Sequence, residues 1–440
     1  VSKCENPVDL SASLFDSLLS SNISINSNIY KDKIINLDGF DIKSIEWNTF
    51  MNLNKPVRTI ILSSNCLSYL PNKIFEEFSK NLINLNLQKN EFNSLNNNYF
   101  LRYLEELRLL DLSKNKINEI FKEDFNGLKR LNTLILRENK ISKLSSNLFI
   151  NCRKVRTLDL SDNNISIIDS NTFNLLNKLK ILLLNNNPLR EYLLTNYLLK
   201  PLINLEYIDL ENTQLKNLLP FLFISNKKLK SIKLRRNFFQ NQIYSNSNSN
   251  STLTKTFCGT NSLIEIDLVN TNINSLDICS YHQIPTLRRL YLMNNPLDCT
   301  CDLFYLKYGD IYRLLFVDSN DNYQTNINID IYLNRWISRP ELRRHLENSF
   351  LRGDIHRLPI DLSLFARCQT PIEWNGYELY NITGIYNQCK YRWFHIEQQC
   401  ANYCLINNHI ELYHTNIKSI SSTFIQYKLF FIGLIIFIYL

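Results

Sequence analysis

Apolar and polar residues alternate along the chain in a pattern, LxxLxLxxN, that occurs ten times. The units begin at Val57, Leu82, Leu107, Leu131, Val155, Leu179, Leu205, Leu229, Leu263 and Leu287. Apolar residues at the fourth and sixth positions predict a short β-strand, and the rest of each unit must return over the outside. No unit can bury its own apolar residues, so the pattern predicts stacked coils that share one core.

Two further positions of the unit have a structural interpretation. Most units have a Phe six or seven residues before the first Leu, which we expect to form a second buried row on the convex side: Phe50, Phe75, Phe100, Phe125, Phe149, Phe173 and Phe223. The ninth position is Asn in eight units and Thr in Thr213 and Thr271. An amide side chain can satisfy backbone groups that have no strand partner, so we interpret these asparagines as structural.

The repeats resemble those of the extracellular leucine-rich repeat family in its 24-residue form. The resemblance spans about residues 31–298 and implies an α/β solenoid, a horseshoe with a concave parallel β-sheet. A weaker unit precedes the first, with Ile35, Leu37 and Ile42 in place. The family usually has a cysteine-rich N-terminal cap, whereas here only Cys4 precedes Cys66. Either that cap is truncated or this end is sealed differently.

The residues after the last repeat resemble the C-terminal flanking cap of the same family. Cys299 and Cys301 in "NPLDCTCDLFYL" are followed by Cys368 and Cys389. The resemblance implies the disulfides Cys299–Cys368 and Cys301–Cys389, which would close the open end of the coil.

An insertion of some forty residues between Cys301 and Cys368 departs from the family pattern. Ser338, Pro340 and Glu341 have the spacing of a helix N-terminus, which predicts a helix there. The insertion contains four arginines that could bind an acidic glycan, although the balanced charge of residues 299–370 favours a solvated surface: Arg339, Arg343, Arg344 and Arg352.

The other cysteines are less constrained by the pattern. We expect Cys258 and Cys279, which flank one repeat, to form a disulfide. Cys152 is at an apolar position of its unit and should be a small core residue. Cys400 and Cys404 could pair with each other. The total of 11 cysteines is odd, so one thiol is free or bonded outside the chain.

The chain ends in an apolar segment, in which Lys428 is the single charged residue after Phe424. It could be a glycolipid-anchor signal, a short membrane helix or a buried strand. We therefore divide the chain into five parts. Residues 1–56 are an N-terminal cap region with a degenerate first repeat, residues 57–298 are the repeats, and residues 299–404 are a cysteine-rich C-terminal cap with an insertion. Residues 405–423 are a linker, and residues 424–440 are a hydrophobic anchor segment.

Composition narrows the class of function. With 8 glycines the chain contains neither a dinucleotide-binding fingerprint nor a phosphate-binding loop. A net charge of +8 over 440 residues is too mild for a dedicated nucleic-acid protein. We find no cysteine–histidine spacing typical of a metal site and expect no enzyme activity and no cofactor.

Cysteine usage indicates an oxidising compartment outside the cytosol. N-glycosylation sequons, which are used in the same compartment, occur at Asn22, Asn164, Asn250 and Asn381. We expect a protein at the extracellular face of the plasma membrane, attached through its tail, or a secreted one.

Residues at the third, fifth and seventh positions of each unit should point from the sheet onto the concave face. Ile181, Leu183 and Tyr207 form an apolar cluster there, bordered by three acidic residues: Asp159, Asp209 and Glu211. A second group combines Lys233, Arg235, Asp267 and Tyr291 with charged neighbours. An exposed apolar patch within a charged rim is typical of a protein interface.

The sequence therefore predicts protein recognition or adhesion through the concave face. The alternatives are a secreted matrix protein that binds glycans or fibrous proteins, and a co-receptor that pairs with a signalling subunit.

Overall fold

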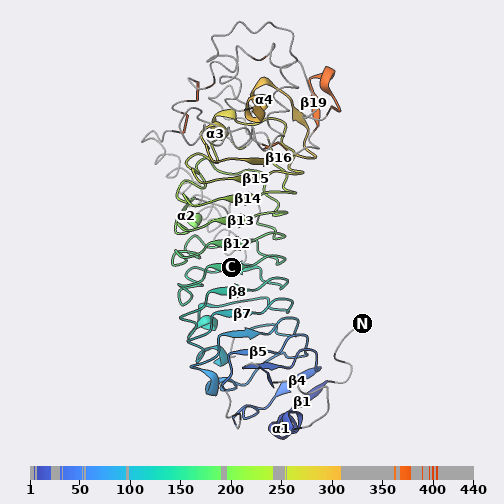
Figure 1. The fold of residues 1–440 in the computed structure, drawn as a ribbon, viewed down its shortest axis with the longest axis vertical. Helices are drawn as coiled ribbons and strands as arrows, with labels where there is room; N and C mark the ends of the chain where they lie inside the picture. The colour runs from blue at the N-terminus through green and yellow to red at the C-terminus, as the bar shows by residue number, and fades with distance from the viewer. Residues whose placement is uncertain are drawn as a thin grey trace, which may run out of the picture.

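The computed structural model describes residues 4, 7–20, 30–31, 33–51, 53, 56–95, 99–189, 196–240, 253, 255–308, 361–362, 367–377, 389, 396, 399–400 and 403–404. These residues form an elongated coil whose strands stack one above another along the long axis (Figure 1). The N-terminal segment lies at one end of the stack, and the C-terminal cap lies at the other.

A 13-stranded sheet runs the length of the coil, in the order β18-β16-β15-β14-β13-β12-β10-β8-β7-β6-β5-β3-β2. Each of the predicted repeats contributes one three-residue strand: β5 Thr59–Ile61, β6 Asn84–Asn86, β7 Leu109–Asp111, β8 Thr133–Ile135, β10 Thr157–Asp159, β12 Ile181–Leu183, β13 Tyr207–Asp209, β14 Ser231–Lys233, β15 Glu265–Asp267 and β16 Arg289–Tyr291. Equivalent residues of successive units pair in register, as Leu158 does with Leu182. The α/β solenoid expected from the repeat pattern is confirmed.

The return segments of the coil are mostly irregular. They contain short 3-10 turns at η1 Glu76–Phe78, η2 Tyr99–Leu101 and η3 Lys122–Phe125, and the helix α2 Asn196–Leu199. One pair of two-residue strands, β9 Lys143–Leu144 and β11 Ile167–Ile168, is parallel on this side.

The ninth-position asparagines join adjacent coils, as their donors and acceptor predicted. Nδ2 of Asn115 donates to the carbonyl oxygens of Leu87 and Leu112, each at 3.0 Å. Its Oδ1 accepts from the backbone nitrogen of Phe92 at 3.1 Å. Thr213 occupies the same position in its unit and has no amide. Its backbone nitrogen and its Oγ1 each donate to Oδ1 of Asn237 in the next unit at 3.1 Å. These buried amides supply the bonds that strand pairing does not.

The predicted row of phenylalanines is buried on the convex side. Ring centroids of Phe125 and Phe149 are 5.9 Å apart, and those of Phe149 and Phe173 are 6.3 Å apart. The row continues beyond the expected residues through Phe257 to Tyr281. Aromatic contacts at these separations add packing energy between coils beyond burial alone.

The N-terminal end is sealed by a strand, a helix and a disulfide. The degenerate unit supplies β3 Ile34–Asn36, which pairs in parallel with β5, and β2 Tyr30–Lys31 pairs with β3 in the antiparallel sense. The strand β1 Val8–Leu10 pairs with β4 Ile42–Ile45. The helix α1 Ala12–Ser20 places Phe15 against Phe50, with ring centroids 5.0 Å apart. A Cys4–Cys66 disulfide, which the sequence left unassigned, ties this segment to the coil.

The C-terminal end is closed by short elements and disulfides. The strand β17 Leu297–Asp298 pairs with β19 Cys368–Thr370, and β18 Asp361–Leu362 pairs with the last repeat strand β16. The helices α3 Ile278–His282 and α4 Cys301–Tyr308 and the 3-10 turn η4 Ile372–Trp374 complete the described part of the cap. Disulfides Cys299–Cys368 and Cys301–Cys389 confirm the pairing implied by the family resemblance.

The expected Cys258–Cys279 disulfide is wrong. Cys258 pairs with Cys404 and Cys279 pairs with Cys400, over 146 and 121 residues of sequence. Cys400 and Cys404 therefore each bond to a cysteine of the coil and not to each other. The Tyr403 hydroxyl donates to Oδ2 of Asp277 at 2.9 Å, which fixes the segment against the same coils. Cys152 is the free cysteine and is buried, as expected.

Some predictions concern residues outside those described: the helix near Ser338, the four arginines of the insertion, residues 241–252, the linker and the tail 424–440. Among the described residues, no helix has the length and apolar character needed to cross a membrane.

Candidate functional site

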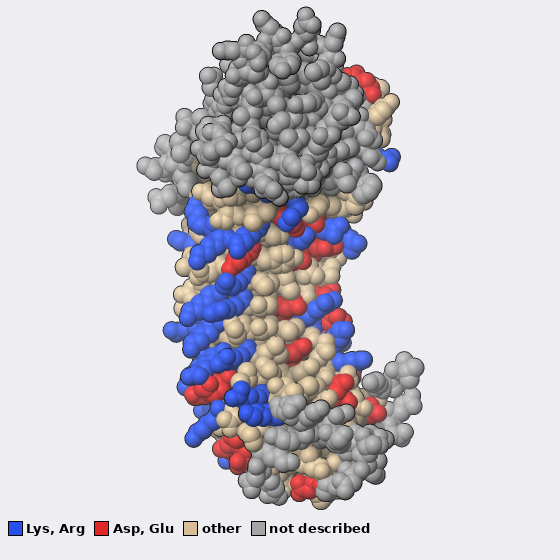
Figure 2. All heavy atoms as spheres, viewed as in Figure 1, with Lys and Arg blue, Asp and Glu red and all other residues tan. Residues whose placement is uncertain are grey.

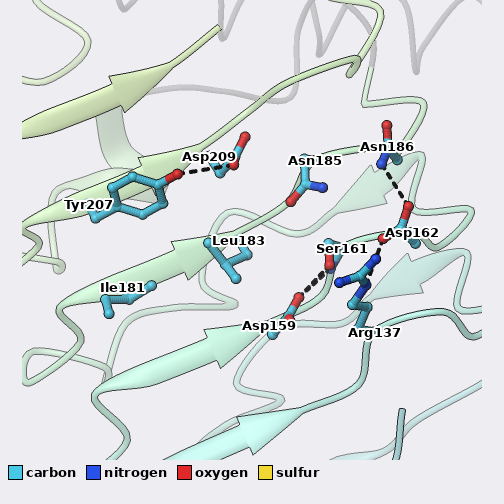
Figure 3. A pocket seen from close by; sticks show the side chains of 10 residues that line it. All are labelled: Arg137, Asp159, Ser161, Asp162, Ile181, Leu183, Asn185, Asn186, Tyr207 and Asp209. Atoms are coloured by element: carbon cyan, nitrogen blue, oxygen red, sulfur yellow. Dashed lines mark hydrogen bonds and ion pairs between the residues drawn. The ribbon is translucent and has the colours of Figure 1, made fainter. Parts of the chain in front are cut away.

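The concave face has a hollow over three neighbouring strands, β10, β12 and β13 (Figure 3). Ile181 pairs in register with Tyr207, and Leu183 with Asp209. Asp159 pairs with Leu183 from the other side. Because strand residues alternate between the two faces, all five side chains project from the concave face while Leu158, Leu182 and Ile208 fill the core.

These side chains border a hollow with a volume of about 570 Å³. Its lining combines the predicted Asp159, Ile181, Leu183, Tyr207 and Asp209 with five residues that the sequence analysis did not single out: Arg137, Ser161, Asp162, Asn185 and Asn186. The additional residues occupy the seventh and eighth positions of their units. The seventh position belongs to the columns that the sequence places on the concave face, and only the eighth position lies outside them.

Apolar surface forms one side of the hollow. Ile181 is 36% exposed, which is high for an isoleucine in a sheet. Leu183 and Tyr207 are each partly buried and lie beside it. This cluster is available for contact with an apolar group of a partner.

The side chains of Tyr207 and Asp209, two residues apart on β13, are hydrogen-bonded to each other. The phenolic hydroxyl of Tyr207 donates to Oδ2 of Asp209 at 3.2 Å, and the backbone nitrogen of Glu211 donates to Oδ1 at 3.0 Å. Burial raises the pKa of Asp209, and these two donors only partly offset that effect. Burial also raises the pKa of Tyr207, and the nearby carboxylate of Asp209 raises it further.

Polar side chains on the other side of the hollow hold one another in place. Oδ1 of Asp159 accepts from Oγ of Ser161 at 2.6 Å and from the nitrogen of the same residue at 3.0 Å. Asp162 accepts from Nε of Arg137 at 2.9 Å and from Nδ2 of Asn186 at 2.6 Å. The rim is therefore preorganised by bonds within the chain (Figure 3).

The second predicted group lies on the next three strands and is a network of ion pairs. Nζ of Lys233 is 2.8 Å from Oε1 of Glu265 and 3.5 Å from Oδ2 of Asp267. Arg235 approaches Asp267 to 3.4 Å, and Arg289 approaches Glu265 to 3.0 Å. Burial lowers the pKa of Lys233, but the bond and charge of Glu265 outweigh it and the net shift is upward.

Three predicted contact residues have roles that their positions alone did not reveal. Asp267 is only 3% exposed, so it holds Lys233 and Arg235 from beneath and presents little surface itself. Glu211 does not line the hollow, and its carboxylate lies 3.6 Å from Arg236. Tyr291 lies under the ammonium of Lys233, which is 5.7 Å from its ring centroid. The charges of this group are largely satisfied within the chain.

One predicted glycosylation site can be placed. Asn164 is exposed just after the Asn163 ladder residue, at the edge of its coil. Asn22, Asn250 and Asn381 lie outside the described residues.

Nothing in the described part of the chain has the arrangement of a metal site, since no three His, Cys, Asp or Glu residues gather there. Asp159 and Asp209 lie on strands separated by β12, and each is bonded to its own hydroxyl donor. The arrangement offers an apolar contact surface between fixed polar groups.

A parallel solenoid with an asparagine ladder, a phenylalanine row and a disulfide-bonded C-terminal cap defines the class of protein. Residues 80–141 and 129–189 match the family model described as leucine-rich repeat. The chain is a leucine-rich repeat protein.

The chain is similar to solved structures of proteins from several organisms. A leucine-rich repeat protein of Leptospira interrogans is 27% identical, with a TM-score of 0.51, over 62% of this chain and 64% of that one. The aligned part thus spans less than two thirds of that relative. A chain from an octameric complex of latrophilin 3, Unc5D and the leucine-rich repeat protein FLRT2 is 16% identical, with a TM-score of 0.54, over 82% and 98%.

A third structure is the complex of Toll with Spatzle from Drosophila. It is 17% identical with a TM-score of 0.51, over 79% of this chain and 47% of that one. No curated protein sequence matches the chain. At these identities the FLRT2 and Toll likenesses establish the fold only.

Proposed function

We propose that this protein recognises a protein partner outside the cell through the hollow of its concave face. The observation that carries the proposal is the exposed apolar cluster of Ile181, Leu183 and Tyr207 within a rim of fixed polar groups. An interface of this composition, with an apolar centre and a polar periphery, is typical of specific protein association.

Preorganisation supports the same interpretation. Arg137, Asp162 and Asn186 are already bonded to one another, and Tyr207 is bonded to Asp209. A partner that binds here would order few additional side chains, which lowers the entropic cost of association. A mixed-charge group beside the apolar cluster would favour one partner over others more than it would add affinity.

An extracellular location is supported by five disulfides, which persist in oxidising compartments: Cys4–Cys66, Cys258–Cys404, Cys279–Cys400, Cys299–Cys368 and Cys301–Cys389. Attachment to the membrane through residues 424–440 is part of the proposal. Release of surface protein by a phosphatidylinositol-specific phospholipase, followed with a tag inserted between residues 241 and 252, would establish a glycolipid anchor, and retention would exclude it.

The function is tested with a multimerised form of the chain incubated with intact cells and with beads coated with the same chain. Leu183→Arg places a charge at the centre of the apolar cluster and should weaken binding by more than about 2 kcal/mol, roughly 30-fold. Ile167→Arg is the matched control, because Ile167 is 48% exposed on the return strand β11, away from the concave face.

Enzymatic treatment of the cells before binding distinguishes a protein partner from a polysaccharide partner. Trypsin should abolish the binding that depends on Leu183, whereas polysaccharide lyases should leave it intact. Equal binding by Leu183→Arg and wild type would refute the site, and binding that survives trypsin would refute a protein partner.

A further inference from the structure

Lys and Arg side chains gather in a column along one edge of the coil, beside the sheet, whereas the opposite edge has both signs of charge (Figure 2). In sequence, the column corresponds to three positions of the repeat: the two residues before the first Leu and the one after it. We call these positions, in the six repeats from Leu107 to Leu229, the basic edge. They hold eleven basic and three acidic residues, and all eleven basic side chains are exposed.

The backbone holds this edge in a regular array. The nitrogen of Lys180 donates to the carbonyl of Arg156 at 2.8 Å, and the nitrogen of Glu206 donates to the carbonyl of Lys180 at 2.8 Å. The nitrogen of Lys230 donates to Glu206 in the same way, at 2.8 Å. Neighbouring parallel strands are about 4.8 Å apart, so five such steps from Arg108 to Lys230 span about 24 Å. The cations therefore form a line and not a pocket.

The acidic residues of the basic edge are neutralised within it. Glu105 and Glu106 pair with Lys129 and Arg130, each at 2.6 Å. Glu206 lies between Lys180 at 2.6 Å and Lys230 at 2.9 Å. Hydrogen bonds from these two lysines lower its pKa to about 2, so it stays ionised and bound.

Seven cations of the basic edge keep a charge that no carboxylate of the described residues neutralises, although Arg153, Lys227 and Lys228 each donate a hydrogen bond to a neutral oxygen of the chain. Arg153, Lys154, Arg156 and Lys178, in the two central repeats, form no ion pair with a carboxylate of the described residues, and neither do Arg108, Lys227 and Lys228. On the opposite edge, Lys114 pairs with Glu138 at 3.8 Å and Arg236 pairs with Glu211 at 3.6 Å. The basic edge therefore carries a larger excess of positive charge than the edge across the sheet, where both signs of charge occur (Figure 2).

We propose that the basic edge binds a linear anionic polysaccharide bearing sulfate or carboxylate groups, laid along the stack across successive coils. A line of exposed cations at a constant spacing matches a polymer with regularly spaced anions, and a basic patch of this kind attracts polyanions from solution. This surface is separate from the hollow of the concave face, so one chain can hold a polysaccharide and a protein partner together.

A polysaccharide fits this surface better than a single-stranded nucleic acid. Proteins that bind single strands combine cations with aromatic side chains on which the bases stack. The three positions of the basic edge contain no aromatic residue in any of the ten repeats. The five disulfides also indicate an oxidising, extracellular compartment, in which sulfated and carboxylated polysaccharides are the abundant linear polyanions.

The test is binding of the full chain to immobilised heparin at physiological ionic strength, with two triple variants that change the net charge equally. Lys154→Glu, Arg156→Glu and Lys178→Glu reverse the centre of the basic edge. Lys43→Glu, Lys140→Glu and Lys143→Glu reverse exposed lysines outside the basic edge, on β4, after β8 and on β9. We expect the first variant to lose about tenfold or more in affinity and the second to retain it, with wild-type binding that weakens steeply with salt.

Three outcomes would overturn the proposal: no heparin binding by the wild type, equal loss in both triple variants, or displacement of heparin by single-stranded RNA at lower concentration than by heparin itself. Thermal midpoints of both variants establish that they are folded. Since the concave residues are unchanged, the trypsin-sensitive binding that depends on Leu183 should persist in both. The basic edge and the proposed protein interface can therefore fail independently.

Discussion

The hydroxyl of Tyr207 lies 3.2 Å from Oδ2 of Asp209 and donates a hydrogen bond to it. The two residues are at the third and fifth positions of one strand, so both side chains project from the concave face. The bond fixes the orientation of the ring, whose hydroxyl points toward Asp209 (Figure 3). An aromatic ring held in this way offers a large contact area at low entropic cost.

Tyr207→Phe should therefore weaken partner binding without unfolding the chain. A hydrogen bond of this kind contributes about 0.5–1.5 kcal/mol, and its full loss in the complex corresponds to a roughly twofold to twelvefold loss of affinity in the cell-binding assay. The thermal midpoint should stay close to that of the wild type. Unchanged affinity would show that the ring orientation does not matter for recognition.

Asn139→Ala should destabilise the whole coil. Nδ2 of Asn139 donates to the carbonyls of Leu112 and Leu136, each at 3.0 Å, and Oδ1 accepts from the nitrogen of Ile117 at 3.0 Å. Each buried group left without a partner costs about 1–3 kcal/mol, so we expect a loss of about 3 kcal/mol or more in urea unfolding. Asn118→Ala, at an exposed position three residues before Phe121, is the control and should change stability little.

Asp124 predicts a measurable pH dependence. Burial raises its pKa to about 6, although its Oδ2 accepts from the backbone nitrogen of Phe121 at 2.7 Å. Because the folded pKa lies above the unfolded value, the stabilising contribution of the protonated form is complete below the unfolded pKa of about 3.8 and is lost as the pH rises through about 6.

An asparagine at position 124 cannot ionise, so Asp124→Asn should not lose stability as the pH rises through about 6. We expect the variant to exceed the wild type in free energy of unfolding by about 1–3 kcal/mol at pH 7, with little difference at pH 4. Denaturant titrations at the two pH values measure the difference. Glu119→Gln, at an exposed carboxylate, controls for the loss of one negative charge. An equal effect of Asp124→Asn at both pH values would contradict the assignment.

The disulfides Cys258–Cys404 and Cys279–Cys400 should be detectable by peptide mapping, and their removal should lower the stability of the fold. Mass spectrometry of unreduced peptides should recover Cys258 linked to Cys404 and Cys279 linked to Cys400. Replacing Cys258 and Cys404 together by Ser should lower the free energy of unfolding by about 2–4 kcal/mol. A Cys258–Cys279 peptide would refute the pairing.

Cys152 provides the matched control for these cysteine variants. It is buried and unpaired, and burial raises the pKa of its thiol to about 12. The native chain should therefore resist thiol-labelling reagents, and one thiol should become reactive on unfolding. Cys152→Ala should leave all five disulfide-linked peptides unchanged.

The repeat pattern was sufficient for the regular part of the protein. Leu158 and Leu182, and the asparagines from Asn65 to Asn187, could be assigned because each coil contacts only its neighbours. A period of about 24 residues then fixes which residues meet. The same alignment contained the basic edge and the eighth-position lining residues Asp162 and Asn186, which could have been found by reading all positions of the unit.

The sequence by itself determined the coil, the asparagine ladder, the phenylalanine row and the columns of the concave face, because these depend on contacts one repeat apart. Only the tertiary structure decided the partners of Cys258 and Cys279, the packing of Phe15 on Phe50 and the burial of Asp267 beneath Lys233 and Arg235. Those contacts depend on the path of the caps and on how deeply each side chain is covered, and neither repeats along the chain.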